Sequence, residues 1–131
     1  MTHSPKDCRF CLDNGLLTDA PILFTEHFYM LGSTDPLLPI AGMIVPRRHS
    51  PDPFAMSIEE WADFGSALAA ARFHFAHHDP DGYTLGWNVG AAAGQHVFHT
   101  HLHIIPRFAN APNAGLGIRR ILKPLRDDAA P

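Results

Sequence analysis

Histidines at alternate positions are the residues of this chain best suited to chemistry. His99, His101 and His103 lie in the stretch GQHVFHTHLHIIPRF, and ten of the 131 residues are histidine. Because side chains alternate between the two faces of a β-strand, a strand over 97–105 would place these imidazoles on one face, about 6.5–7 Å apart. Such a row can supply a nucleophile, a proton donor and metal ligands. The alternative is the polar, solvent-facing side of an edge strand, which three histidines in register make the weaker interpretation.

Residues suited to an anionic ligand flank this segment. Gly90 and Gly94 let the backbone approach a ligand closely, and Asn88 and Gln95 carry uncharged hydrogen-bond donors. Such donors suit phosphate oxygens. We therefore expect a small phosphate-bearing ligand beside the histidines.

Cys8 and Cys11, the only cysteines, form a Cys-x-x-Cys pair in a turn-rich opening segment. A thioredoxin-like redox pair would lie where a strand meets a helix, whereas this pair precedes the first expected strand. A structural zinc ion needs four nitrogen or sulfur ligands, so histidines would have to complete the site. Two unremarkable thiols are the third interpretation, and the pair alone leaves all three open.

The elements expected to position these residues form an α+β fold. Clusters of β-branched and aromatic residues predict strands of an antiparallel sheet over 22–25, 27–31, 42–46, 83–89 and 97–105, the last of them terminated by Pro106. Ser57 predicts the N-cap of a long helix that ends near His78. The apolar stripe of this helix, which should pack on the sheet, comprises Ile58, Trp61, Phe64, Leu68, Ala71 and Phe75.

Composition limits the kind of protein this is. A length of 131 residues, 46% of them hydrophobic, fits one domain over 1–131, with a cysteine-bearing loop over 1–20 and a flexible tail over 109–131. A net charge of −3 does not favour binding to a nucleic-acid polymer. The apolar stretches are shorter than the ~18 residues of a membrane span, and the first ten residues lack the apolar core of a signal peptide. We therefore expect a cytoplasmic protein that is not bound to a membrane.

The histidine segment resembles the signature of the histidine triad (HIT) superfamily of nucleotide hydrolases and transferases. The matching pattern is Gly94-Gln95-x-Val97-x-His99-x-His101-x-His103, followed by IIPR. Upstream, MIVPRRH ends at His49, and Asn88 lies seven residues before Gln95. The resemblance runs from Cys8 to about Arg120 and implies the HIT fold, an antiparallel sheet of about five strands with one long helix and a short helical segment packed on it.

The resemblance also implies a role for each matching residue. His101 would attack the α-phosphorus of a nucleotide and form a nucleotidyl-imidazole, His103 would contact the phosphate, and His99 would complete the catalytic triad. The substrate would contact Asn88, Gly94, Gln95, Val97 and Ser33. In zinc-containing branches of the family, a cysteine pair shares the metal with a histidine after the third strand and with the first histidine of the triad. Here that structural zinc would be held by Cys8, Cys11, His49 and His99.

The activity implied is that of a homodimeric nucleotide hydrolase that cleaves the α-phosphate linkage of a dinucleoside polyphosphate or a related nucleotide. A nucleoside phosphoramidase and a nucleotidyl transferase are alternatives within this class, and a weakly catalytic nucleotide- or zinc-binding module is an alternative outside it. The sequence departs from the family at Ala41, where many members carry a histidine, and at Ser33, where several carry a ribose-binding Asp or Asn. Arginines near the C-terminus either reach a polyphosphate or are solvated, namely Arg107, Arg119 and Arg120.

Overall fold

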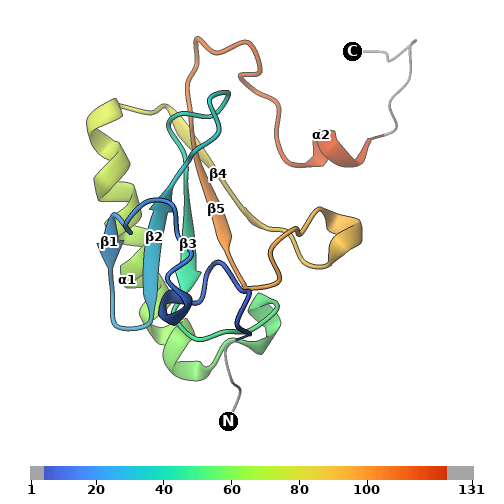
Figure 1. The fold of residues 1–131 in the computed structure, drawn as a ribbon. Helices are drawn as coiled ribbons and strands as arrows, with labels where there is room; N and C mark the ends of the chain where they lie inside the picture. The colour runs from blue at the N-terminus through green and yellow to red at the C-terminus, as the bar shows by residue number, and fades with distance from the viewer. Residues whose placement is uncertain (1–4, 124–131) are drawn as a thin grey trace.

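A five-stranded antiparallel sheet forms the centre of the computed structural model, which describes residues 5–123 (Figure 1). The strand order is β1-β2-β3-β5-β4. The strands are β1 (Leu23–Phe24), β2 (Phe28–Gly32), β3 (Gly42–Pro46), β4 (Gly82–Trp87) and β5 (Leu102–Arg107). The helices are α1 (Ile58–Phe75) and the short α2 (Arg119–Leu122), together with the 3-10 turns η1 (Leu12–Asn14), η2 (Pro53–Ala55), η3 (Ala76–His78) and η4 (Ala91–Ala93). The expected α+β architecture is confirmed.

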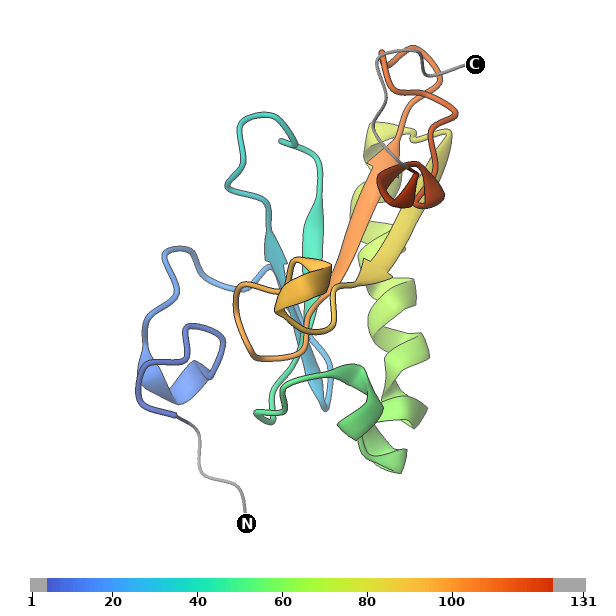
Figure 2. The same cartoon turned by 90° about the vertical axis from the view of Figure 1, so that its right-hand side faces the viewer.

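The sheet has a different cover on each face. Figure 2 shows α1 on one side of the strands and the N-terminal segment on the other. Alternate residues of each strand serve the two faces, so Met30 of β2 packs toward α1 while the neighbouring Tyr29 packs toward the N-terminal segment. The core on the α1 face comprises Phe28, Met30, Ile44, Met56, Ala67, Ala71, Phe75, Leu102 and Ile104. The core on the other face comprises Cys8, Phe10, Cys11, Tyr29, Leu31 and Val45.

Helix α1 begins as the sequence predicts. The Ser57 hydroxyl accepts a hydrogen bond from the Glu60 backbone N–H at 3.0 Å, and the Glu60 carboxylate accepts one from the Ser57 backbone N–H at 2.7 Å, which completes a capping box. The predicted apolar stripe is wrong at its start, because Ile58 is 85% exposed. The first turn of α1 extends past the ends of the strands (Figure 2), so the sheet does not reach this side chain.

The predicted strand over 97–105 is wrong at both ends. Strand β5 begins at Leu102, so His99 and His101 precede it and only His103 lies within it. Residues 97–101 are fastened to the loop after β3, since the Thr100 backbone N–H donates to the Ser50 carbonyl at 2.8 Å. Pro106 lies inside β5 because the pairing of β5 with β3 ends at Ile104, so the missing N–H interrupts no bond to β3.

The expected tail is described only in part. Residues 109–123 contain turns and α2, whereas residues 124–131 of that tail and residues 1–4 of the N-terminal loop lie outside the described residues. Over residues 5–123, no helix combines the length and apolar character needed to cross a membrane.

Candidate active site and metal centre

Cys8, Cys11, His49 and His99 form a cluster of potential metal ligands. One ligand atom from each residue lies within 4.8 Å of the other three. The Nδ1 atom of His99 is 3.4 Å from the Cys8 Sγ, 3.6 Å from the Cys11 Sγ and 3.3 Å from the His49 Nδ1. Ligands around a tetrahedral zinc ion are separated by roughly 3.3–3.8 Å, given the usual zinc–sulfur and zinc–nitrogen bond lengths. Both cysteines are buried and neither forms a disulfide, so the four residues fit a metal ion.

The surroundings of His99 direct its Nδ1 atom toward this cluster. The ring is fully buried, and its Nε2 atom lies 2.7 Å from the carbonyl oxygen of Pro46, at the end of β3. Because a carbonyl can only accept, Nε2 carries the proton and Nδ1 offers a lone pair to a metal. Burial is the main cause that lowers the pKa of His99 to about 4, which keeps the imidazole neutral as a ligand must be.

His101 has the opposite arrangement of its two ring nitrogens. Its Nδ1 atom lies 2.8 Å from the carbonyl oxygen of His99, so Nδ1 donates and the lone pair is on Nε2. The residue is 8% exposed, and its ring meets the edge of the Phe10 ring at a centroid distance of 5.1 Å. Burial lowers the pKa of His101, and the positive charge of Arg9 lowers it further. A neutral imidazole with one free lone pair is a competent nucleophile.

His103 lies beside His101 on β5. It is paired with Met43 of β3 and with Gly86 of β4, and its ring centroid is 5.1 Å from that of His101. The pKa of His103 is lowered, first by burial and then by the neighbouring His101. His101 and His103 therefore form a pair on the sheet face that carries the potential metal ligands. His99 is not part of this pair, because it is one of those potential ligands.

Gln95 is buried, and its side chain binds backbone groups. The Oε1 atom accepts from the Gly90 N–H at 2.7 Å, and Nε2 donates to the carbonyls of Pro51 at 2.7 Å and Val97 at 3.2 Å. Gly94 adopts a φ of +93°, a left-handed conformation that favours glycine. In this structure Gln95 shapes the loop that leads to the histidines, while Asn88 is exposed at the edge of that loop.

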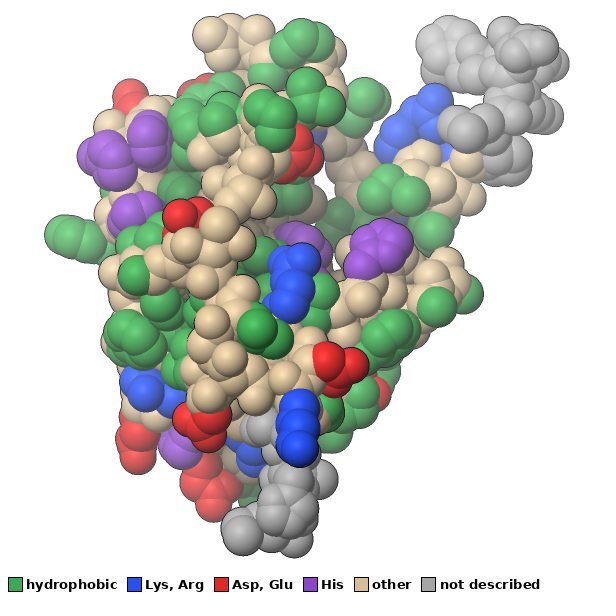
Figure 3. Space-filling view, viewed as in Figure 1, with side chains coloured by type: hydrophobic (Ala, Val, Ile, Leu, Met, Phe, Trp, Pro, Cys, Tyr) green, Lys and Arg blue, Asp and Glu red, His purple; other side chains and the backbone are tan. Residues whose placement is uncertain are grey.

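A cavity of about 410 Å³ lies between the N-terminal segment and strands β2 and β3. Ser33, the position expected to contact a sugar, is part of its wall, together with Phe10 and Met43. Phe10 also touches His101, so one wall of this cavity is a residue in contact with the histidine pair. Figure 3, which looks onto the N-terminal segment, shows histidine and basic side chains side by side near the middle of this face.

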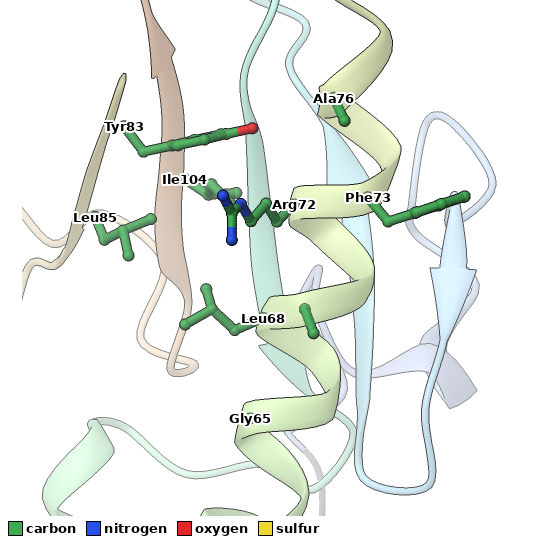
Figure 4. Close-up of a pocket in the computed structure, with 9 residues that line it drawn as sticks. Gly65, Leu68, Arg72, Phe73, Ala76, Tyr83, Leu85 and Ile104 are labelled. Atoms are coloured by element: carbon green, nitrogen blue, oxygen red, sulfur yellow. The ribbon is translucent and has the colours of Figure 1, made fainter. Parts of the chain in front are cut away.

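A second cavity, of about 680 Å³, lies on the α1 face of the sheet and is lined largely by apolar side chains (Figure 4). Leu68 and Arg72 of α1 face Tyr83, Leu85 and Ile104 of the sheet across it. None of the candidate site residues lines this cavity.

Three residues that the sequence analysis left without a role contribute to the site. Phe10 separates the two cysteines and packs against His99 and His101. Ser50 and Thr100 follow the ligands His49 and His99, and their hydroxyl oxygens are 3.0 Å apart, which ties the two ligand-bearing loops together. In the sequence, the signal that could have indicated Ser50 and Thr100 was that each directly follows a potential metal ligand. Arg107, considered for a polyphosphate, instead donates to Thr84 and to two backbone carbonyls of the tail.

Comparison with known proteins assigns the chain to a family. The model of the HIT domain matches residues 16–110. The chain belongs to the HIT family. It is 59% identical over 118 residues to an uncharacterized HIT-like protein of Borreliella burgdorferi, a match that covers 87% of this chain and 83% of that one.

Two further comparisons relate this HIT protein to named and solved relatives. It is 35% identical over 94 residues to the bis(5'-adenosyl)-triphosphatase of Dictyostelium discoideum, which covers 70% of this chain and 63% of that one. The crystal structure of a HIT family protein from Bacillus anthracis superposes with a TM-score of 0.72 at 29% identity, over 85% of this chain and 79% of that one. Hydrolase activity toward nucleotides is thus supported at the level of the superfamily, and the expected HIT fold is confirmed.

Proposed function

We propose that this HIT protein hydrolyses the α-phosphate linkage of a dinucleoside polyphosphate, or of a related nucleotide, through a covalent intermediate on His101. The observation that carries the proposal is the hydrogen bond from His101 Nδ1 to the His99 carbonyl at 2.8 Å. That bond holds the ring in one orientation and leaves the Nε2 lone pair available for attack. The relative named as a bis(5'-adenosyl)-triphosphatase supports this substrate class.

The reaction would proceed by two displacements. The Nε2 lone pair of His101 forms a bond to the α-phosphorus as the bond to the bridging oxygen breaks, and the leaving phosphate departs with the electron pair. Water then attacks the same phosphorus and loses a proton to the solvent, the phosphorus–nitrogen bond breaks, and the electron pair returns to Nε2. The neighbouring His103 would contact the phosphate, and the loop of Asn88, Gly94 and Val97 would border it.

The metal would be a structural zinc ion held by Cys8, Cys11, His49 and His99. Two sulfur and two nitrogen ligands are typical of structural zinc sites. When bound, the ion would hold His99 in place, and His99 in turn presents the carbonyl that orients His101. The ion would have no part in attacking the phosphorus, because all four ligand positions are taken by the protein.

The cavity bordered by Ser33 would receive the nucleoside. Its volume of about 410 Å³ and its wall of Leu16, Leu17, Ile22, Leu31 and Met43 suit an apolar base, and Ser33 and Thr34 offer hydroxyls to a sugar.

We further propose that the protein is a cytoplasmic homodimer. The edge strand β4 and the apolar cavity beside α1 would form the contact between its subunits.

Replacing the proposed nucleophile tests the function. We expect His101→Ala to reduce hydrolysis of diadenosine triphosphate by a factor on the order of 10⁴ or more, since removal of a nucleophile leaves only residual catalysis. The matched control is His78→Ala, which removes an exposed histidine from the 3-10 turn η3 that follows α1. Rapid quenching of wild-type turnover with labelled substrate should also trap an acid-labile nucleotidyl adduct. A His101→Ala variant that retained the native rate would contradict the assignment.

One observation favours a second candidate, a nucleotide-binding module with weak catalysis. The buried Ala41 stands where many HIT proteins carry a histidine, so the site has one imidazole fewer for proton transfer. Under this alternative the protein would bind AMP but hydrolyse neither diadenosine triphosphate nor a nucleoside phosphoramidate. A panel of these substrates separates a hydrolase, a phosphoramidase and a binding module.

A further inference from the structure

Arg9 carries a positive charge between the two cysteines, at the edge of the cavity bordered by Phe10. Cys8 and Phe10 on either side of it are buried, while Arg9 itself is exposed and lines the cavity with Ser33 and Met43. Its guanidinium carbon lies 5.4 Å from the centroid of the Phe10 ring. The same ring meets His101 at a centroid distance of 5.1 Å, so the cation and the histidine both contact Phe10.

The backbone under Arg9 is held firmly on both sides. The Tyr29 hydroxyl of β2 donates to the carbonyl of Phe10 at 2.6 Å, and Cys8 and Cys11 belong to the metal cluster. A long flexible side chain on a fixed backbone, stacked on a fixed ring, has fewer conformations to lose when it binds a ligand. Arg9 is therefore better prepared to bind an anion than an arginine on a mobile loop.

Three other arginines of the described chain, Arg47, Arg48 and Arg107, are engaged elsewhere. Arg48 donates to the Glu60 carboxylate at 2.7 Å, and Arg107 donates to Thr84 and to carbonyls of the tail. Arg47 donates to the Thr25 carbonyl and stacks on Phe24. For Arg9, the described residues supply only the contact with Phe10, which leaves its guanidinium donors directed at solvent or a ligand.

We propose that Arg9 binds a non-bridging phosphate oxygen of the nucleotide while His101 attacks the phosphorus. The inference rests on the proposed function, because it takes the cavity beside Phe10 as the place where the substrate lies. The guanidinium group forms charge-assisted hydrogen bonds with phosphate oxygens, often two at once.

This role makes the cysteine loop part of the substrate site as well as of the metal centre. Cys8 and Cys11, which would hold the metal, also fix the position of the side chain that would neutralise the substrate's charge. Phosphoryl transfer depends mainly on positioning and charge neutralisation, so a cation at this position would lower the barrier to attack.

Binding of AMP and of adenosine to Arg9→Gln tests the inference, because the two ligands differ only by the phosphate. Isothermal titration calorimetry should give a dissociation constant for AMP roughly 10- to 100-fold above that of the wild type, the usual effect of losing one charge-assisted hydrogen bond. The dissociation constant for adenosine should not change. Arg9→Lys, which keeps the charge, should recover part of the affinity for AMP.

Two controls separate this role from a structural one. Lys6→Gln removes the same charge from the same segment outside the cavity, and we expect it to bind AMP as the wild type does. Metal content measured by elemental analysis should be equal in the wild type and in Arg9→Gln. If AMP binds equally well to the wild type and Arg9→Gln, or if adenosine loses as much affinity as AMP, the inference is wrong.

The outcome for Arg9 is independent of the outcome for the proposed reaction. If His101→Ala abolishes hydrolysis and Arg9→Gln binds AMP normally, the proposed function stands and the inference about Arg9 fails. If the wild type hydrolyses no nucleotide but its binding of AMP depends on Arg9, the proposed reaction fails and the phosphate contact stands. A wild type that does not bind AMP overturns the inference whatever its hydrolytic activity.

Discussion

The α1 face of the sheet is closed by a regular helix, whereas the opposite face is closed by a segment with only one short 3-10 turn. On the α1 face, Ala67, Ala71 and Phe75 pack on Phe28 and other apolar side chains of the strands. The N-terminal segment, residues 5–20, contributes a smaller apolar cluster around Phe10, and it is fastened by the cysteine and histidine cluster. The first face owes its stability to apolar burial and helix formation, and the second to a few specific bonds.

The difference explains why the candidate active site lies on the second face. A helix satisfies its own backbone hydrogen bonds and excludes polar groups from the sheet it covers. The irregular segment brings Phe10 against His99 and His101, and it brings the two cysteines against His99. A covering segment with little core of its own needs a cross-link, and a metal ion is one way to supply it.

Removal of a bound metal should have the largest effect on stability. The effect should be confined to the face of the sheet that the N-terminal segment covers. Structural zinc contributes on the order of 10 kcal/mol in small domains that fold around the metal. We expect a chelator to lower the melting temperature and to remove hydrogen-exchange protection around Cys8 and Phe10, while amides in α1 stay protected. The Cys8→Ser/Cys11→Ser variant should not respond to the chelator. An unchanged melting temperature in metal-free wild-type protein would contradict this.

Truncation of Phe75 should disturb the other face by a smaller amount. The ring is 3% exposed and lies over Gly42 of β3, where an added Cβ would meet it at 3.2 Å. Phe75→Ala should cost about 3–5 kcal/mol of unfolding free energy, measured by chemical denaturation. Metal content should be unchanged. Phe54→Ala, at an 86% exposed position, should cost less than about 0.5 kcal/mol, and an equal effect of the two changes would contradict the assignment of the core.

Loss of the Glu60 carboxylate tests the ion pair that joins α1 to the loop bearing His49. Burial would raise the pKa of Glu60, but hydrogen bonds from Arg48 and Ser57 and the charge of Arg48 lower it below its ordinary value of 4.5. A lowered pKa means that the ionised form stabilises the fold above pH 4.5 and that this contribution is lost as the pH falls below that value. Glu60→Gln should therefore cost roughly 1.5–3 kcal/mol at pH 7.

The pH dependence of the destabilisation by Glu60→Gln tests whether the charge of Glu60 causes it. In metal-free protein, the difference in unfolding free energy between the wild type and Glu60→Gln should shrink between pH 7 and pH 3.5, because acid protonates the wild-type carboxylate. A difference that stayed constant or grew on acidification would show that Glu60 acts through its shape and not through its charge.

The smallest expected effect belongs to the helix cap. Ser57→Ala removes the hydroxyl that accepts from the Glu60 N–H, and it should cost about 1 kcal/mol of unfolding free energy. Ser66→Ala, at an exposed position within α1, should be neutral or slightly stabilising because alanine is the better helix former. A thermal melt of both variants checks the difference, and equal destabilisation would exclude a capping role for Ser57.

Local signals in the sequence predicted much of the architecture. The N-cap at Ser57 and all five strands are present, because capping and β-propensity depend on neighbouring residues. The start of β5 and the exposure of Ile58 were predicted wrongly, because they depend on where the loop after β3 and the ends of the strands lie. The spacing of the cysteines and histidines also indicated the four metal-cluster residues, although only through the family resemblance.

The sequence by itself determined which kinds of residue this protein could use: imidazoles at alternate positions, a cysteine pair and a glycine-bordered loop. Tertiary structure alone decided which ring nitrogen of each histidine is left free. His99 and His101 are chemically identical in the sequence, yet one binds the Pro46 carbonyl through Nε2 and the other binds the His99 carbonyl through Nδ1. The nitrogen left free on each ring depends on the position of a backbone carbonyl, which the folded chain fixes and the spacing of histidines does not reveal.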